Sequence, residues 1–489
     1  MISPSIFVCR LMLQKKIDCR QPTDIWLSQL IEEMCRAIKN YMRRALKEGI
    51  TLNDYAFADY ASTIELVSVA RFNVLWTTSV EEMFNSNHPM NEIKSVYQNL
   101  TTKVASLCKE VIHVIGGSGD GGESGGGGGG GDGENKDEAP TNEVKMNKAT
   151  NLLNLYLSKR NQLFSFLQKS VTSSGDFAWK SSFRLFWKRE HDNIEARQGY
   201  AMQRFGNEYQ AAFKVPLETE STLKAQFAMF TSLHEYRPIY LKGAIFSGKS
   251  SCIMELAFRL GRYLVFLNLN PGYTPQNMVE SLQGLCRSNC WAHYDGFDLL
   301  DYETLSILTT QLQQINLAQS MNLKEFHLSG RKTQLGLQTG FFFLSRKADQ
   351  DPQEIQQQLP PISLCSQFRQ VYLQAPDIGP LVQAELLARG FGQPKTLTNS
   401  LMAIIKTFYK ITTPGFRHIP MLTITREIFS RLPSTDKTES SHVATATMDT
   451  MRAMLPATGE NLNHDKGTCI NDVQFLGRVG GSSKIGQGW

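Results

Sequence analysis

Eight consecutive residues, Gly243 to Ser250, fit the pattern G-x-x-x-x-G-K-[ST]. A loop of this kind between a strand and a helix directs backbone N–H groups at phosphate oxygens, and the helix N-terminus adds partial positive charge. Gly248 would allow close approach, Lys249 would neutralise the β- and γ-phosphates, and Ser250 would offer a hydroxyl to Mg²⁺. The intervening residues of this candidate cradle are Ala244, Ile245, Phe246 and Ser247. The sequence therefore predicts a nucleotide phosphate site, and the alternative is a glycine turn without a ligand.

The partner of such a loop should be an apolar strand that ends in an acidic residue, and NCWAHYDGFDLL supplies one. Asp295 closes this strand, where it would hold the Mg²⁺ water shell. ATPases of this layout usually carry Glu at the next position to polarise the attacking water, and here that position is Gly296. Losing general-base assistance costs about 10²–10⁴ in rate. Asp298 shares the strand parity of Gly296 and is only a weak substitute, so no catalytic residue is assigned.

The elements that must position these residues alternate between short apolar strands and amphipathic helices from about Val215, which is typical of an α/β fold. Strands are predicted at PIYLKG, YLVFLNLN, NCWAHYD, TGFFFLS and QVYLQAPD. The segment SSCIMELAFRLGR, directly after the phosphate loop, has the apolar spacing of a helix. The expected fold class is α plus α/β. It combines a helical bundle, a P-loop module with a parallel five-stranded sheet and helices on both faces, and a small helical lid.

Composition divides the chain into six segments. Residues 1–115 and 143–212 have helical periodicity, and between them lies 116–142, which is mostly glycine and should be disordered because it cannot bury apolar surface. Residues 213–378 are the predicted α/β subdomain and 379–432 the lid. Residues 433–489 are rich in Ser, Thr, Gly, Asp and Asn and are expected to form a poorly ordered tail. The aromatic and basic stretch FAWKSSFRLFWKRE at 177–190 is interpreted as a helical packing face rather than a single-stranded nucleic acid site.

The composition excludes several classes of partner. The chain has 489 residues, of which 41% are hydrophobic and 20% charged, ordinary values for a globular protein. A net charge of +5 is too weak to argue for nucleic acid or an anionic membrane surface. No apolar run approaches the roughly 20 residues that span a bilayer. Nine scattered cysteines without repeated C-x-x-C pairs indicate a reducing interior, so we expect a cytoplasmic protein.

The stretch EYQAAFKVPLETESTLKAQFAMFTSLHEYRPIYLKGAIFSGKSS resembles the start of the first AAA+ module of dynein heavy chains. There a Tyr-Glu-Tyr segment and a Pro-Leu-Thr turn precede the Walker A loop. NCWAHYDGFDLL is similar to the family's Walker B form, Trp-Ala-Cys-Phe-Asp-Glu-Phe-Asn-Arg, and GFRHIPMLTI resembles the helix that carries the second sensor arginine. IWLSQLIEEMCRAIK, FNVLWTTSVEEMF and FAWKSSFRLFWK are similar to the C-terminal half of the dynein linker. The resemblance covers about residues 24–432.

The resemblance implies further roles. Arg417 matches the second sensor arginine, Arg346 replaces the first-sensor Asn, and the adenine pocket falls at Val215, Pro216 and Leu217. The implied cofactor is Mg-ATP or Mg-ADP, with Ser250 and Asp295 holding the metal. The implied partners are dynein intermediate and light intermediate chains and adjacent AAA+ modules, with microtubules involved only indirectly. The implied location is the cytoskeleton, including the axoneme of a cilium or flagellum.

Three functions remain open on the sequence. The first is a dynein-like module that binds nucleotide with little or no hydrolysis and acts structurally. The second is an active ATPase that contributes to minus-end-directed, microtubule-based movement. The third is a scaffold whose helices bind dynein partner chains without nucleotide. A dynein ring has six modules and its first site receives an arginine finger from the second, whereas this sequence carries one module, so we expect a fragment or a short isoform.

Overall fold

The computed structural model describes residues 11–47, 49–116, 142–210, 213–244, 247–345, 362–391, 393–411, 421–432 and 440–454. The chain forms two compact units. The first unit combines Met1–Thr102 with Ser158–Pro376, and the second combines Lys103–Leu157 with Asp377–Trp489. None of the helices in the described ranges is long and apolar enough to cross a bilayer.

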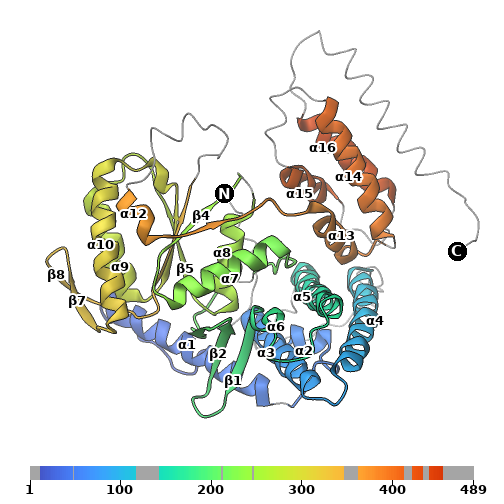
Figure 1. Cartoon of the computed structure of the whole chain (residues 1–489), viewed down its shortest axis with the longest axis horizontal. Helices are drawn as coiled ribbons and strands as arrows, with labels where there is room; N and C mark the ends of the chain where they lie inside the picture. Colours follow the sequence, from blue (N-terminus) through green and yellow to red (C-terminus); the bar gives the residue numbers. More distant parts are fainter. Residues whose placement is uncertain are drawn as a thin grey trace, which may run out of the picture. The chain divides into compact units, whose positions relative to one another are not determined.

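The first unit contains a parallel five-stranded sheet in the order β10-β4-β9-β6-β5. Two of its strands, β4 and β5, are labelled in Figure 1. Each neighbouring pair is parallel. The strands are β4 (Ile239–Lys242), β5 (Leu264–Asn268), β6 (Trp291–Asp295), β9 (Gly340–Leu344) and β10 (Arg369–Tyr372). All five match the strands expected from the sequence, so the predicted α/β class with a five-stranded parallel sheet is confirmed.

Helices cover both faces of this sheet, as Figure 1 shows. One face carries α9 (Pro275–Ser288), α10 (Tyr302–Ser320) and the short α12 (Ile362–Gln367), and the other carries α7 (Glu220–His234) and α8 (Lys249–Arg259). Alternate side chains of a strand point to opposite faces. Ala292 and Tyr294 of β6 accordingly join the core formed with α9 and α10, which leaves His293 and Asp295 facing the side of α8.

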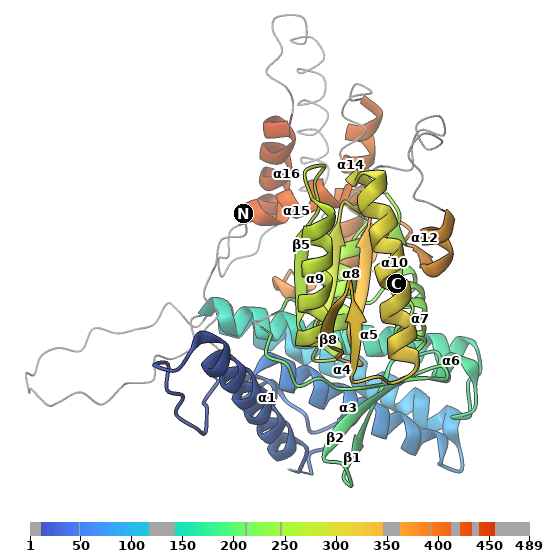
Figure 2. The same cartoon turned by 90° about the vertical axis from the view of Figure 1, so that its left-hand side faces the viewer.

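Helices precede the sheet in the chain, and their bounds are α1 (Thr23–Lys47), α2 (Phe57–Ala61), α3 (Glu65–Phe84), α4 (Pro89–Gly116), α5 (Asn142–Gln168) and α6 (Phe177–Lys180). The prediction that 143–212 is helical was wrong after α6. Residues there form an antiparallel sheet of β1 (Arg184–Lys188), β2 (Asn193–Gln198) and β3 (Ala201–Arg204), whose β1–β2 hairpin is visible in Figure 2. The physical reason is period-two burial, in which Ile194, Ala196 and Gln198 are buried and their neighbours are not.

A second hairpin was missed by the sequence analysis. Strands β7 (Glu325–Leu328) and β8 (Arg331–Gln334) pair antiparallel between α10 and β9. Both turn residues, Ser329 and Gly330, have positive φ of 49° and 76°, the backbone signs of a two-residue hairpin turn. In β7 the apolar Phe326 and Leu328 alternate with Glu325 and His327, and β8 contains no apolar residue, so a search for apolar runs finds neither strand.

The second unit includes a helical cluster formed by α13 (Ile378–Ala388), α14 (Pro394–Ile411), α15 (Met421–Arg431) and α16 (Ser440–Met454). Helix α16 contradicts the expectation of a poorly ordered tail from residue 433. Its Val443, Ala446 and Met451 are buried in one apolar cluster with Ile405 and Ile428. Apolar residues at helical spacing thus form a buried helix here, although the composition is rich in Ser and Thr. The glycine-rich segment lies outside the described residues apart from Gly116 and Asn142, which end α4 and begin α5.

Candidate nucleotide-binding site

The candidate loop leaves the carboxyl end of β4 and leads into α8, as the sequence predicts. Gly243 has φ 144°, and a Cβ added there would lie 2.4 Å from the backbone oxygen of Leu373. Gly248 has φ 93° and caps α8 in the left-handed region, with open space around its missing Cβ. The first glycine is therefore required by the protein's own packing. The second leaves room above the helix N-terminus, where backbone N–H groups are directed at an anion.

Polar groups of the loop suit such an anion. Lys249 Nζ donates to the carbonyl oxygens of Gly243 at 2.7 Å and Ala244 at 2.9 Å, so the ammonium group lies over the loop. Ser247 Oγ is buried and has no hydrogen-bond partner among the described residues. The positive charge, the unpaired hydroxyl and the open cradle at Gly248 together fit a phosphate group.

The end of β6 contacts the start of α8. Ser250, the second residue of α8, has its Oγ 3.0 Å from Nε2 of His293, and the two groups are hydrogen-bonded. Asp295 lies two residues further along β6 and has the same strand parity as His293. A hydroxyl and a carboxylate are oxygen ligands of the type that Mg²⁺ prefers. Ser250 and Asp295 thus lie on elements that meet, as the predicted metal site requires.

His293 was not singled out by the sequence analysis. Its side chain is buried, with Nδ1 unpaired among the described residues, and it lies in register between Phe266 of β5 and Phe342 of β9. Burial lowers the pKa of His293, and the nearby charge of Asp295 opposes this effect. Its strand parity with Asp295 was the one signal that could have found it.

The residues after Asp295 do not continue the strand, whereas the parity argument for Asp298 assumes that they do. Gly296 has φ 83° and ψ 33° and caps the 3₁₀ turn η1 (Phe297–Leu299), and its N–H donates to the carbonyl of Leu344 at 2.9 Å. Because the strand ends at Asp295, the parity argument that placed Asp298 beside Gly296 does not hold. Asp298 lies within the turn. The usual position of the general base therefore has neither a side chain nor an extended backbone.

A buried charge cluster holds the far end of α8. Glu218 accepts a hydrogen bond from Arg259 at 2.6 Å and pairs with Lys159 of α5 at 3.4 Å, and Arg259 also lies 3.6 Å from Glu255. Burial by itself raises the pKa of Glu218, but the charges of Lys159 and Arg259 outweigh it and bring the pKa to about 2. For Glu255 burial dominates and raises the pKa to about 7. The phosphate-loop helix is thus tied electrostatically to the preceding helical region.

The remaining predicted site residues are placed unevenly. Val215 and Leu217 are buried and Pro216 is half-buried, directly before Glu218 and the Thr219 N-cap of α7. Ile245, Phe246, Arg346 and Arg417 lie outside the described residues. The proposed adenine and sensor contacts therefore remain predictions.

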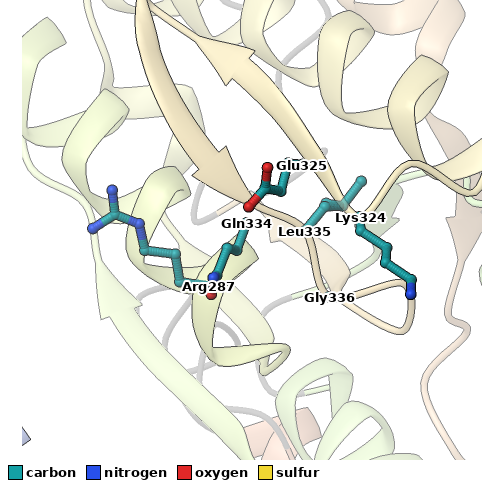
Figure 3. Close-up of a pocket in the computed structure, with 6 residues that line it drawn as sticks. All are labelled: Arg287, Lys324, Glu325, Gln334, Leu335 and Gly336. Atoms are coloured by element: carbon teal, nitrogen blue, oxygen red, sulfur yellow. The ribbon is translucent and has the colours of Figure 1, made fainter.

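A separate pocket of about 600 Å³ lies beside the β7–β8 hairpin. Figure 3 shows Arg287 and Lys324 pointing away from each other on either side of it. Gly336, which also lines it, donates to the carbonyl of Cys286 near the amino ends of β6 and β9. The phosphate loop lies at the opposite, carboxyl edge of the parallel sheet, so this pocket is not part of the candidate site.

Comparison with known proteins gives one family match and several relatives. Residues 205–414 match the family described as "Hydrolytic ATP binding site of dynein motor region". Dynein axonemal heavy chain 2 of Mus musculus is 21% identical over 386 residues, which is 78% of this chain and 8% of that protein. Dynein axonemal heavy chain 10 of Homo sapiens is 24% identical over 383 residues, 77% of this chain and 8% of that protein. The chain therefore spans less than a tenth of the length of these relatives.

Proposed function

We propose that this chain, a relative of the dynein heavy chains that carries their AAA ATP-binding region, binds ATP or ADP with Mg²⁺. It would hydrolyse little or none of the nucleotide and would act structurally in a dynein-type assembly. The observation that carries this proposal is the contrast between two turns. The turn from Gly243 to Ser250 keeps every fixed position of the phosphate motif, while the turn after Asp295 has Gly296 in place of a base.

Binding is supported by the groups that face the loop. The first-turn N–H groups of α8 and the Lys249 ammonium would hold the phosphates, and Ser250 and Asp295 would hold the metal. The metal ion would neutralise part of the negative charge of the phosphates. Val215, Pro216 and Leu217 would line the adenine pocket, and Arg417 would serve as the second sensor arginine.

Weak hydrolysis is supported by the chemistry that the β6 turn lacks. Water attacks phosphate slowly unless a group orients it or accepts its proton. Gly296 has no side chain, and Asp298 lies on a 3₁₀ turn rather than on the strand. The binding groups of the loop are independent of this loss, so the module would retain its nucleotide.

A structural role for bound nucleotide follows from mass action. A ligand at about 100 times its Kd stabilises the folded state by about 2.7 kcal/mol. Helix α8 carries the loop at one end and the buried Glu218–Arg259 pair at the other, so occupancy would stabilise the junction with the helical region. We infer that neighbouring AAA+ modules and intermediate or light intermediate chains are its partners. The axonemal relatives favour a ciliary, cytoskeletal location.

An active ATPase is the second candidate. It is favoured by the match to a family whose description names a hydrolytic site. It needs a base other than residue 296, and a partner module would have to supply the arginine that stabilises the transition state.

Equilibrium titration with fluorescent ADP and ATP analogues in Mg²⁺ tests the proposal. We expect saturable binding that weakens about 10–100-fold in Lys249→Ala, because charge-assisted hydrogen bonds contribute about 1.5–3 kcal/mol. Lys224→Ala is the matched control, since Lys224 is an exposed lysine of α7 in the same unit. Absence of binding in folded wild-type protein would reject the proposal and leave the scaffold function.

A further inference from the structure

The histidine beside the phosphate loop is the observation that the proposed function does not use. His293 is 3% exposed and lies on β6, an interior strand of the sheet, between Phe266 of β5 and Phe342 of β9. Its Nδ1 has no partner among the described residues. An unpaired buried polar group is destabilising, and an aliphatic residue would avoid that cost. The other nitrogen, Nε2, contacts the start of the phosphate-loop helix.

That other nitrogen faces the residue expected to bind the metal. Nε2 of His293 and Oγ of Ser250 are 3.0 Å apart. Two ligand atoms at about 2.1 Å from one ion and at right angles to each other are separated by about 3.0 Å. The hydrogen-bond spacing observed here equals that of two adjacent ligands of an octahedral ion, so an ion could take the place of the shared proton without moving either atom. Asp295, two residues along the same face of β6, lies about 6.6 Å further toward the carboxyl edge.

We propose that His293 is a direct ligand of the nucleotide-bound divalent ion, beside Ser250, and that the site therefore prefers Mn²⁺ or Co²⁺ to Mg²⁺. This inference rests on the proposed function, because nucleotide phosphates complete the ligand set. Among the described residues no cluster of three or more His, Cys, Asp or Glu could hold a metal alone. Imidazole nitrogen suits first-row transition ions, whereas Mg²⁺ takes oxygen ligands and keeps its waters. His293 is thus the specificity-determining residue for the ion.

The first test compares ions in the presence of saturating ADP. The concentration of Mg²⁺ and of Mn²⁺ that gives half-maximal thermal stabilisation is measured for wild type, His293→Leu and His327→Leu. His327 is an exposed histidine of β7 and serves as the control. We expect the ratio of the Mg²⁺ value to the Mn²⁺ value to fall about tenfold in His293→Leu and to stay unchanged in His327→Leu. An unchanged ratio in His293→Leu would overturn the inference.

The second test detects the metal–nitrogen bond and needs no variant. Electron spin-echo envelope modulation of the wild-type Mn²⁺–ADP complex should show directly bonded nitrogen, and labelling histidine with ¹⁵N should change the modulation. Bound Mn²⁺ without histidine nitrogen would overturn the inference while leaving the proposed function intact. Stronger Mg²⁺ binding in His293→Leu with the Mn²⁺ value unchanged would also overturn it, since His293 would then block Ser250. Failure of ADP to bind with any ion would reject both the proposed function and this inference.

Discussion

The turns after β4 and β6 lie at the same edge of one sheet, and both contain glycines with positive φ, but the glycines have different consequences. Gly243 and Gly248 build a cradle, the first because backbone fills the place of its side chain and the second because space is left for a ligand. Gly296 removes the side chain that chemistry would need and turns the chain away from the strand. On the proposed function, binding and hydrolysis would depend on separate turns, so one could be lost while the other is kept.

The largest expected effect comes from Gly243→Ala. The added Cβ would lie 2.4 Å from the Leu373 backbone oxygen, and the alanine would have to adopt a φ of 144°. We therefore expect a loss of about 2–5 kcal/mol in the free energy of unfolding. Gly248→Ala is the matched variant, since its Cβ meets no atom within 4 Å, and strain alone should cost about 1–2 kcal/mol. Urea unfolding measures both. Equal losses would show that the two glycines do not differ as described.

The helix behind the first turn can be tested by pH. Because the pKa of Glu255 is raised to about 7 in the folded state, the folded chain holds more protons than the unfolded chain between about pH 4.5 and 7. Stability should therefore fall as pH rises through this window, and Glu255→Gln should flatten that fall. Glu280→Gln, at an exposed position of α9, should leave it unchanged. A wild-type stability that rises across the window would contradict the assignment.

The second turn can be tested by restoring its missing side chain. Gly296→Glu places a non-glycine residue at φ 83°, and we expect a loss of about 1–2 kcal/mol in stability. Phosphate release should stay near background, because the side chain would start from a turn rather than from an extended strand. Steady-state phosphate release and urea unfolding check the two parts. Turnover gained without loss of stability would show that the side chain alone was limiting.

The smallest effect is expected at Asp298. Asp298→Asn should change neither nucleotide affinity nor phosphate release, since the residue lies on η1 rather than on β6. Asp295→Asn, three residues earlier, should weaken metal-dependent nucleotide binding about tenfold. The pair distinguishes the acidic residue that ends the strand from the one that follows it. A rate change confined to Asp298→Asn would identify it as the substitute base.

Much of this arrangement could be predicted from the sequence. The five sheet strands are short apolar runs between amphipathic helices, and the loop motif predicts which strand and helix flank the candidate phosphate loop. The β1–β3 sheet could not be predicted, because Trp187 and its aromatic and basic neighbours also suit a helical face and the strands are only four to six residues long. The contact between His293 and Ser250 joins residues 43 apart in sequence. It depends on which residues of β6 pack against the start of α8, and local periodicity does not specify this.

The central claim is that the module holds nucleotide without splitting it, and single-turnover phosphate release tests it most directly. Excess protein is mixed with ATP and Mg²⁺, and in parallel with Mn²⁺, and bound nucleotide and free phosphate are followed together. The account predicts full binding by wild-type protein with release no faster than in Lys249→Ala. Release that is clearly faster than in Lys249→Ala would contradict it and assign the chain an active site.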